Sequence, residues 1–239
     1  MRPMRSFGGG GGFGFAGVES MAARLAIGLV VGSVLSLAAR SIGGLLVLSP
    51  GAVFPGFFLW QPFTYAFVEL HPFSIIFGAF MLYSIGGALE MSWGSRRLLW
   101  VLWGGTALAG LLTVLVSLFF PQLRAFPYAG GWVMGTIAWV AYGLSIGRGQ
   151  ANFWGVPVTG NILAGIGAGF VVLNALSAGW ASQIPELFAL GIAFAYVRGG
   201  SPRQLWLRVQ HWRLQRQLRG RSRHLRVISH ERPDDRYLN

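Results

Sequence analysis

Residues 82–97 read LYSIGGALEMSWGSRR, and this stretch decides the fold. It continues an apolar run that begins near Pro72 and ends at Trp93-Gly94, and two consecutive Arg follow after Ser95. An apolar run of about 20 residues is long enough to cross the hydrocarbon core of a bilayer as a helix. Trp and Arg are typical of the end of such a helix, where the chain reaches the membrane surface. We therefore predict a transmembrane helix over about 72–91.

The composition of the whole chain agrees with this prediction. Of 239 residues, 54% are hydrophobic and only 11% are charged, and the mean hydropathy is +0.55. Soluble proteins carry roughly 25% charged residues. So few charges would not cover a soluble surface, and they also exclude a disordered chain or a coiled coil. We predict an all-α, polytopic membrane protein.

Six segments are long and apolar enough to be spans. We expect them at about 21–39, 72–91, 98–119, 130–147, 158–178 and 182–197. The segment 41–71 is also apolar, but four Pro interrupt it or close it. We expect this segment to form a broken interfacial, partly re-entrant loop after the first helix.

The basic residues predict the orientation. The chain has 19 Arg and no Lys, and eleven Arg lie at or after Arg198. If the N-terminus lies inside, seventeen Arg fall on the inner side and only Arg40 and Arg124 fall on the outer side. Inner loops of membrane proteins are rich in basic residues. We therefore expect both termini in the cytoplasm and the protein in the cell membrane (plasma or inner membrane).

Three regions follow from this layout. We expect a flexible Gly-rich arm over 1–20, a six-helix membrane domain over 21–198 and a basic cytoplasmic tail over 199–239. Arg near a membrane surface attracts anionic lipid by about 1 kcal/mol each, so we expect the tail to contact anionic lipid headgroups. No RNA-binding motif accompanies the charge, and we do not expect a nucleic-acid partner.

Cysteine and histidine usage limits the chemistry. The chain has no Cys, which excludes disulfides, Cys-ligated zinc and thiol catalysis. Only four His occur, and three of them lie in the basic tail. We expect no cofactor and no metal site.

Two stretches together resemble the rhomboid superfamily of intramembrane serine proteases. Residues 60–67 read WQPFTYAF and resemble the Trp-Arg motif in the long loop after the first helix of that family. Trp60 matches the Trp of the motif, and Gln61 stands in place of its Arg. Residues 82–97 resemble the turn that closes the second helix, with Glu90, Trp93 and Gly94 as its matching residues. The resemblance covers about residues 50–198 and implies a six-helix bundle.

The same resemblance implies that the catalytic dyad is missing. The family carries a Ser nucleophile in a Gly-x-Ser-Gly motif, which here reads Ala129-Gly130-Gly131 with Gly135 as a further matching glycine. Gly130 therefore stands at the nucleophile position. Glu186 stands at the position of the family's His base. We expect these two residues to face each other across the fourth and sixth spans.

The remaining polar positions depart from the family as well. Ser74 and Gly78 stand where the family places the His and Asn that stabilise an oxyanion. Met134 stands where an aromatic residue usually packs beside the catalytic His. His71 and Ser74 are close enough to form another dyad, but we interpret His71 as an interfacial residue.

Four further interpretations concern single residues. Trp132 would fill space that a substrate needs beside the nucleophile position. We expect Glu69 to be solvated in the outer loop and Glu90 to be interfacial and structural. Glu186 is either a client, lipid or proton contact or a locally hydrogen-bonded group near the outer water boundary.

Small residues are spaced four apart in three of the expected spans. They are Gly131 and Gly135, Gly165 and Gly169, and Ala189 and Ala193. This spacing allows close approach of transmembrane helices. We interpret all three pairs as packing sites.

These observations leave two main functional hypotheses. The first is a rhomboid-like pseudoprotease that binds transmembrane segments of client proteins without cleaving them, with Trp132, Met134, Gln61 and Glu186 as candidate cavity residues. The alternative is an active rhomboid endopeptidase with a displaced active site. A transporter or scaffold that uses only the fold is a third interpretation.

Overall fold

The computed structural model describes Gly17, residues 19–153 and residues 156–199. Most of the expected N-terminal arm and of the basic tail lies outside these residues. In chain order the elements are α1 Met21–Ala38, α2 Arg40–Leu46, α3 Pro50–Val53, α4 Gln61–Thr64, η1 Tyr65–Phe67, α5 Pro72–Trp93, α6 Ser95–Leu99, η2 Trp100–Gly104, α7 Gly105–Phe119, η3 Pro121–Ala125, α8 Gly131–Ile146, β1 Gln150–Phe153, β2 Val156–Thr159, α9 Gly160–Ala178, η4 Trp180–Gln183 and α10 Ile184–Arg198.

The protein is an all-α polytopic membrane protein. Within the described residues, five helical segments are long and apolar enough to cross a membrane: α1, α5, the continuous segment Ser95–Phe119, α9 and the segment Trp180–Arg198. They lie at the positions that the apolar runs predict. The sixth apolar helix, α8, has 16 residues and is shorter than the other five.

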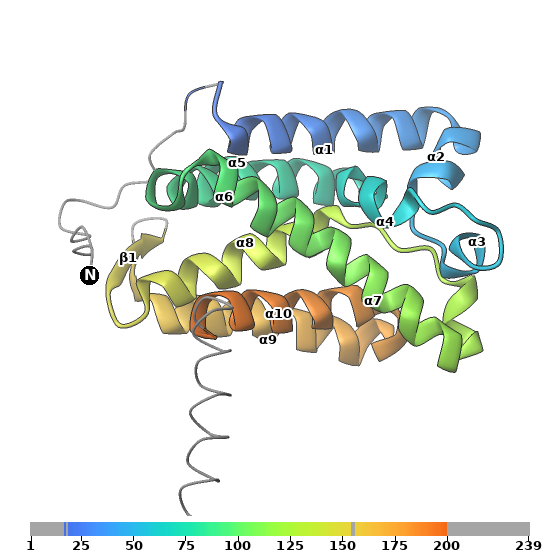
Figure 1. Ribbon diagram of the computed structural model, residues 1–239. Helices are drawn as coiled ribbons and strands as arrows, with labels where there is room; N and C mark the ends of the chain where they lie inside the picture. The colour runs from blue at the N-terminus through green and yellow to red at the C-terminus, as the bar shows by residue number, and fades with distance from the viewer. Residues whose placement is uncertain (1–16, 18, 154–155, 200–239) are drawn as a thin grey trace, which may run out of the picture. The chain divides into compact units, whose positions relative to one another are not determined.

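Helix α8 lies at the centre of the bundle (Figure 1). It packs against α5, α9 and α10, and to a smaller extent against α7. Ten of its 16 residues are buried. Helix α1 packs on α5, and α7 packs on α10, so the longer helices surround the short one.

The ends of the long helices follow from local sequence. Ser20 caps α1 by accepting a hydrogen bond from the Ala23 N–H at 3.1 Å. Pro72 begins α5, in the first turn, where a missing N–H costs nothing. Gly94 and Gly179 end α5 and α9 with φ of 82° and 89°, which residues with a Cβ rarely adopt.

The loop between α1 and α5 folds on itself instead of spanning. Trp60 donates its indole N–H to the Leu45 carbonyl at 3.0 Å. The fully buried Gln61 side chain accepts from the Ser49 N–H at 3.0 Å and donates to the Gly44 carbonyl at 3.1 Å. These contacts connect the short helices α2 and α4, and they use Gln61 as an internal hydrogen-bonding group.

The connection between α8 and α9 is a β-hairpin, which the sequence did not predict. Strands β1 and β2 pair antiparallel, with Gln150 opposite Thr159 and Phe153 opposite Val156. The run from 150 to 159 is too short and too mixed to show a clear period-two pattern. The hairpin lies at the end of α8 that also carries Arg148.

The small-residue pairs act as packing sites only in part: a Cβ on Gly131 would lie 2.5 Å from Cδ1 of Leu29 in α1, so this glycine does allow a close contact. A Cβ built on Gly135, Gly165 or Gly169 would meet nothing within 4 Å, so these glycines allow no close helix contact. The close approach of α8 and α9 is elsewhere, because a Cβ on Gly143 would lie 2.7 Å from the Gly160 carbonyl oxygen. Ala189 and Ala193, in contrast, are fully buried.

Candidate functional site

The candidate site lies at the N-terminal end of α8, where the sequence predicts the nucleophile position. Gly130 donates its N–H to the Tyr65 carbonyl at 2.9 Å, and Gly131 donates to the Val68 carbonyl at 3.2 Å. The Trp132 N–H donates to the Glu69 carboxylate at 2.5 Å. A helix N-terminus normally leaves such N–H groups free to bind an anion. Here the segment 65–69 already satisfies them.

The side chain of Tyr65 fills the space beside Gly130. A Cβ on Gly130 would lie 2.7 Å from Cδ2 of Tyr65, and a Cβ on Gly110 of α7 would lie 2.7 Å from Cε1. The ring is therefore held between two glycines, and it is fully buried. Its hydroxyl donates to the Thr106 carbonyl at 2.6 Å. Tyr65 therefore fills the space directly beside Gly130, whereas the Trp132 ring packs against Phe77.

Glu69 is buried, and the expectation that it is solvated is wrong. Only 5% of the residue is exposed. Its backbone N–H donates to the Ser33 Oγ at 2.8 Å, and its carboxylate caps α8. Burial raises the pKa of the Glu69 carboxyl, although the Trp132 N–H and the charge of His71 oppose the shift. The loop thus carries a dehydrated acidic group in contact with a helix N-terminus.

Glu186 lies in the first turn of α10 and is 7% exposed. Its Oε2 has no hydrogen-bond partner among the described residues. Burial and the nearby Glu186 together raise the pKa of Tyr65, and they raise the pKa of Tyr128 to about 12. We call Tyr65, Glu69, Tyr128 and Glu186 the Gly130 cluster. The cluster supplies carboxyl and phenol groups but no imidazole.

The other predicted site residues are mostly inaccessible. Gln61 and Met134 are fully buried. Gly78 is buried too, and a Cβ there would lie 3.2 Å from Cδ2 of Leu29. Ser74 is half-buried on α5, and His71 is exposed just before that helix.

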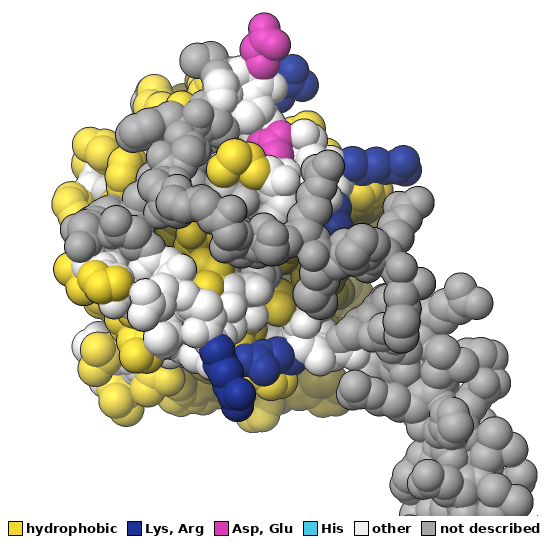
Figure 2. Space-filling view, turned by 90° about the vertical axis from the view of Figure 1, so that its left-hand side faces the viewer, with side chains coloured by type: hydrophobic (Ala, Val, Ile, Leu, Met, Phe, Trp, Pro, Cys, Tyr) yellow, Lys and Arg dark blue, Asp and Glu magenta, His cyan; other side chains and the backbone are white. Residues whose placement is uncertain are grey.

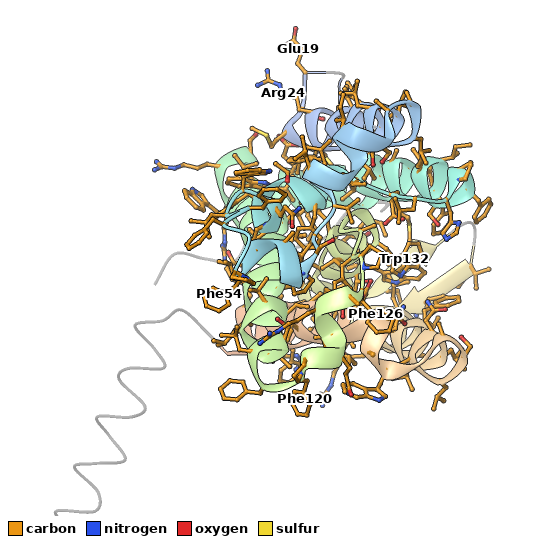
Figure 3. All side chains as sticks on the ribbon, turned by 90° about the vertical axis from the view of Figure 1, so that its right-hand side faces the viewer. Glu19, Arg24, Phe54, Phe120, Phe126 and Trp132 are labelled. Carbon is orange, nitrogen blue, oxygen red and sulfur yellow. The ribbon has the colours of Figure 1, made fainter. Side chains whose placement is uncertain are left out.

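Of the four candidate cavity residues, only Trp132 is partly open. Its indole lies between α5 and α9 (Figure 3) and packs against Phe77, with ring centroids 5.9 Å apart. A small crevice of about 10 Å³ separates these helices over α8 and is lined by Gly78, Met81, Trp132, Gly135, Thr136, Trp139, Gly167 and Phe170. The Trp132 Nε1 is buried and has no acceptor among the described residues.

A family comparison supports the membrane assignment. A family model described as "Eukaryotic integral membrane protein (DUF1751)" matches residues 23–141, about half of the chain. The match begins in α1 and ends in α8, so it includes Tyr65, Glu69 and Gly130 but not Glu186. No curated protein matches the chain. With the helices described above, this similarity identifies the chain as an integral membrane protein.

The sequence did not single out Tyr65, although it lies within the quoted stretch WQPFTYAF. Nothing along the chain connects it with Gly110 and Gly130, which are 45 and 65 positions away. The arrangement becomes visible only when α7 and α8 are placed against the loop.

Proposed function

We propose that this protein is a rhomboid-like pseudoprotease, which binds transmembrane segments of client proteins and does not cleave them. The observation that carries the proposal is the Tyr65 ring beside Gly130. A nucleophile at this position would need a side chain, free space for the substrate carbonyl and a base within hydrogen-bonding distance. The position has no side chain, the space beside it holds a phenol ring, and α10, which packs against α8, carries a carboxyl group in its first turn.

We propose that the client docks on the exposed apolar faces of α5 and α9 that flank the crevice, because the crevice itself has room for only about one water molecule. Helices α5 and α9 carry strongly exposed apolar residues, among them Phe73 and Ile76 on one side and Phe170 and Leu173 on the other. The unpaired Trp132 indole N–H lies between them. A buried donor without an acceptor costs free energy. If the partly exposed indole turned toward the client, a client carbonyl freed by a break in the client helix would satisfy it.

Three further parts of the proposal come from the sequence. The protein would lie in a cell membrane with both termini in the cytoplasm. Its basic tail would contact anionic lipid headgroups. The bilayer itself is the environment that the exposed apolar faces require.

The decisive experiment measures cleavage and binding in the same liposomes. The full chain is reconstituted with a model membrane-spanning substrate, and a photo-crosslinking amino acid replaces Phe170. The control carries it at Leu115, an exposed residue of α7. We expect crosslinks from position 170 several-fold above those from 115, no cleavage and no labelling by a fluorophosphonate probe.

For both the binding and the cleavage measurement, one result would contradict the proposal. Trp132→Phe keeps an aromatic ring but removes the indole donor, and we expect it to reduce the crosslinks at 170. Equal crosslinking from 170 and 115 would contradict client binding at the crevice. Cleavage that a serine-directed inhibitor abolishes would establish the alternative, an active endopeptidase.

Restoring the dyad should not restore proteolysis. The double variant Gly130→Ser, Glu186→His supplies a hydroxyl and an imidazole, but the new Cβ at 130 lies only 2.8 Å from the Tyr65 carbonyl oxygen. Missing oxyanion donors alone reduce the rate by about two to three powers of ten. We expect no measurable cleavage even after Ser74→His, Gly78→Asn and Trp132→Ala are added, unless Tyr65→Ala is included. Robust cleavage by the double variant would refute this account.

A further inference from the structure

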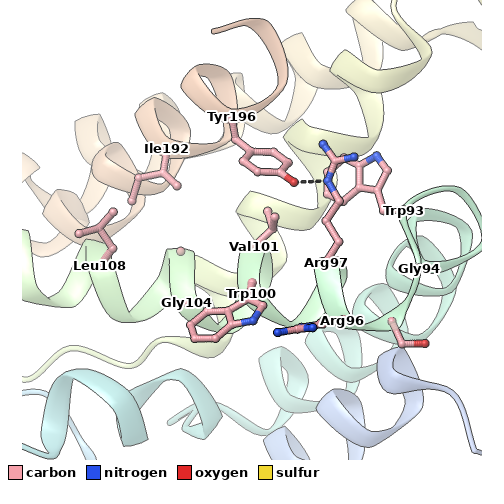
Figure 4. A pocket seen from close by; sticks show the side chains of 12 residues that line it. Trp93, Gly94, Arg96, Arg97, Trp100, Val101, Gly104, Leu108, Ile192 and Tyr196 are labelled. Carbon is pink, nitrogen blue, oxygen red and sulfur yellow. Dashed lines mark hydrogen bonds between the residues drawn. The ribbon is translucent and has the colours of Figure 1, made fainter. Parts of the chain in front are cut away.

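A second feature lies at the opposite end of the bundle, far along the helices from Gly130. A groove of about 810 Å³ runs between the Ser95–Phe119 segment and α10 (Figure 4). Its lining includes Trp93, Arg97, Trp100, Gly104, Leu108 and Tyr196. We call it the Arg97 groove. It has a basic, aromatic mouth and an apolar floor.

The mouth presents an oriented guanidinium group. The Arg97 Nε–H donates to the Tyr196 hydroxyl. The Arg97 Cζ lies 5.4 Å from the centre of the Trp93 ring and 5.2 Å from that of Tyr196. No hydrogen bond or ion pair within the described part of the chain uses the two terminal nitrogens of Arg97. Two donors therefore remain in a fixed position, and a guanidinium fork suits the oxygen atoms of a phosphate.

The mouth carries two Arg, whereas the Glu90 carboxylate beside it already accepts the Met21 and Ala22 N–H groups and the Ser95 hydroxyl. Arg96 and Arg97 are both exposed, and neither forms an ion pair with a carboxylate of the described residues. Arg24 near the start of α1, Arg148 just after α8 and Arg198 at the end of α10 lie at this same end of the bundle. Figure 2 looks onto this end and shows separate Arg side chains among apolar ones, with acidic side chains beside some of them. An anionic group is the complement of this surface.

The floor has the length of one lipid leaflet. From Arg97 to Leu108 the chain advances eleven residues, which is about 16 Å of helix. Half of a hydrocarbon core of about 30 Å is about 15 Å. Gly104 and Gly105 have no side chains that would fill the groove. Leu108 and Ile192 make its far end apolar. One acyl chain can lie along it while its phosphate remains at Arg97.

A π-helical turn makes room for this geometry. Residues Trp100–Gly104 form the turn η2, and Trp100 projects at the groove edge with 63% exposure. Such turns often occur at functional sites because they displace side chains from the regular helical positions. Trp is favoured at the level of lipid headgroups. We propose that the Arg97 groove binds an anionic phospholipid, with the phosphate on Arg97 and one acyl chain along Gly104 and Leu108.

The test uses a photoactivatable lipid and the full chain. The protein is reconstituted in an equal mixture of phosphatidylcholine and phosphatidylglycerol, with a diazirine near the end of one acyl chain of either lipid. Adducts are mapped to peptides, so lipid held by the basic tail is counted separately. We expect adducts on the segments around Leu108 and Ile192 to be several-fold more frequent with the phosphatidylglycerol probe.

Two variant pairs test the two halves of the groove. Arg97→Gln should reduce these adducts about fivefold, the factor for one Arg at a membrane surface, while the matched change Arg148→Gln should leave them within about twofold. Gly104→Leu should block the floor, since a Cβ there has only an ordinary contact with Trp100 at 3.5 Å. Its control is Gly165→Leu, at a glycine with open space around it. The thermal unfolding midpoints confirm that each variant folds.

Three results would overturn the proposal. Equal labelling by the two lipids would remove the anionic preference, and unchanged labelling in folded Gly104→Leu would remove the acyl chain from the groove. Displacement of the phosphatidylglycerol probe by a transmembrane client segment would assign the groove to a protein partner instead. The client crosslinks from position 170 are measured in a separate assay. Loss of the lipid proposal would therefore not contradict client binding at the crevice.

Discussion

The absence of a side chain at position 130 has a structural explanation apart from any loss of chemistry. The backbone of Gly130 donates to the Tyr65 carbonyl, and the Tyr65 ring covers its α-carbon. The other edge of the ring, at Cε1 and Cζ, lies against Gly110. A residue with a Cβ at either position would push the ring or the loop away. Gly130 is thus required by packing.

Gly130→Ala should destabilise the protein by about 1–3 kcal/mol, the usual cost of an extra methyl group in a filled site. The carbonyl oxygen of Tyr65, 2.8 Å from the new Cβ, is backbone and cannot rotate away. Gly135→Ala in the same helix is the control, because its Cβ would meet nothing within 4 Å. Intrinsic Trp fluorescence during heating gives both midpoints. Equal midpoints for the two variants would contradict the packing of Tyr65 against Gly130.

Glu69 makes stability depend on pH. Burial raises its pKa in the folded protein, so the protonated form is favoured there more than in the unfolded chain. Its contribution is therefore fully present below the ordinary carboxyl pKa of about 4.3 and is lost as the pH rises through the raised value. Glu69→Gln, which keeps an acceptor for the Trp132 N–H, should remove this dependence.

The measurement compares the unfolding midpoint of the protein and of Glu69→Gln from acidic to neutral pH. We expect the natural protein to lose stability relative to the variant as the pH rises. A difference that stays constant with pH would show that Glu69 does not titrate in this range. Other carboxyl groups are common to both proteins and cancel in the comparison.

At the scale of elements, α1 is fixed at its start by a residue from another helix. The Glu90 carboxylate of α5 accepts the Met21 N–H at 3.0 Å and the Ala22 N–H at 2.9 Å. It also accepts the Ser95 hydroxyl. A carboxylate at a helix N-terminus satisfies free N–H groups and complements the helix dipole. Glu90 therefore joins α1, α5 and the turn into α6.

Glu90→Ala should weaken the docking of this end of α1 by about 1–2 kcal/mol, the usual contribution of a helix cap. Hydrogen exchange of the first amides of α1 should accelerate about tenfold, while exchange at the other end of the helix stays unchanged. Glu19→Gln is the control, since Glu19 is exposed and makes no hydrogen bond with another described residue. Equal acceleration in both variants would show that Glu90 does not hold α1.

The elements also show what the sequence could and could not predict. Apolar length located the five long helices, because a bilayer imposes that length on a span, and a shorter apolar run located α8. The spacing of small residues was a poorer guide. Gly165 and Gly169 have the packing pattern but lie in open space, whereas Gly143 packs on Gly160 without any such pattern. Which face of a helix packs against a neighbour depends on the neighbouring helix as well. The sequence of one helix alone therefore does not determine its packing face.

The candidate site was also predictable only in part. The position of Gly130 at the start of a helix was predictable from the motif around it. The burial of Glu69 was not, since an acidic residue in a loop is normally hydrated. Tyr65 was not predictable either, because its contacts connect a loop to two helices distant in sequence.

At the scale of the whole molecule, the described Arg residues lie at the two ends of the bundle. Of the described Arg residues, Arg40 and Arg124 follow α1 and α7 at one end. The others belong to the end where α5, α8 and α10 finish, near Arg97. This separation agrees with the basic-inside rule when that end is cytoplasmic.

We predict that reporter fusions after residues 97, 148 and 200 all report a cytoplasmic location. A fusion after residue 124 should report the opposite side. The fusion after 148 is the most demanding, since it depends on the short α8 crossing the bilayer. A non-cytoplasmic result there would contradict both the orientation and the sixth span.

Helix length also bears on which membranes suit this protein. Among the five long helices, α9 is the least covered by the rest of the chain, and its 19 residues extend about 28 Å. Helix α1, with 18 residues, extends about 27 Å. Endoplasmic reticulum bilayers have hydrocarbon cores of about 27 Å, whereas sterol-rich plasma membranes reach about 32–33 Å. In thick bilayers the lipid must compress around α9, so of the two cell membranes that the sequence suggests, hydrophobic matching favours a thin, sterol-poor inner membrane over a sterol-rich plasma membrane. Thermal stability in vesicles of increasing acyl length should fall once the hydrocarbon core exceeds the length of α9.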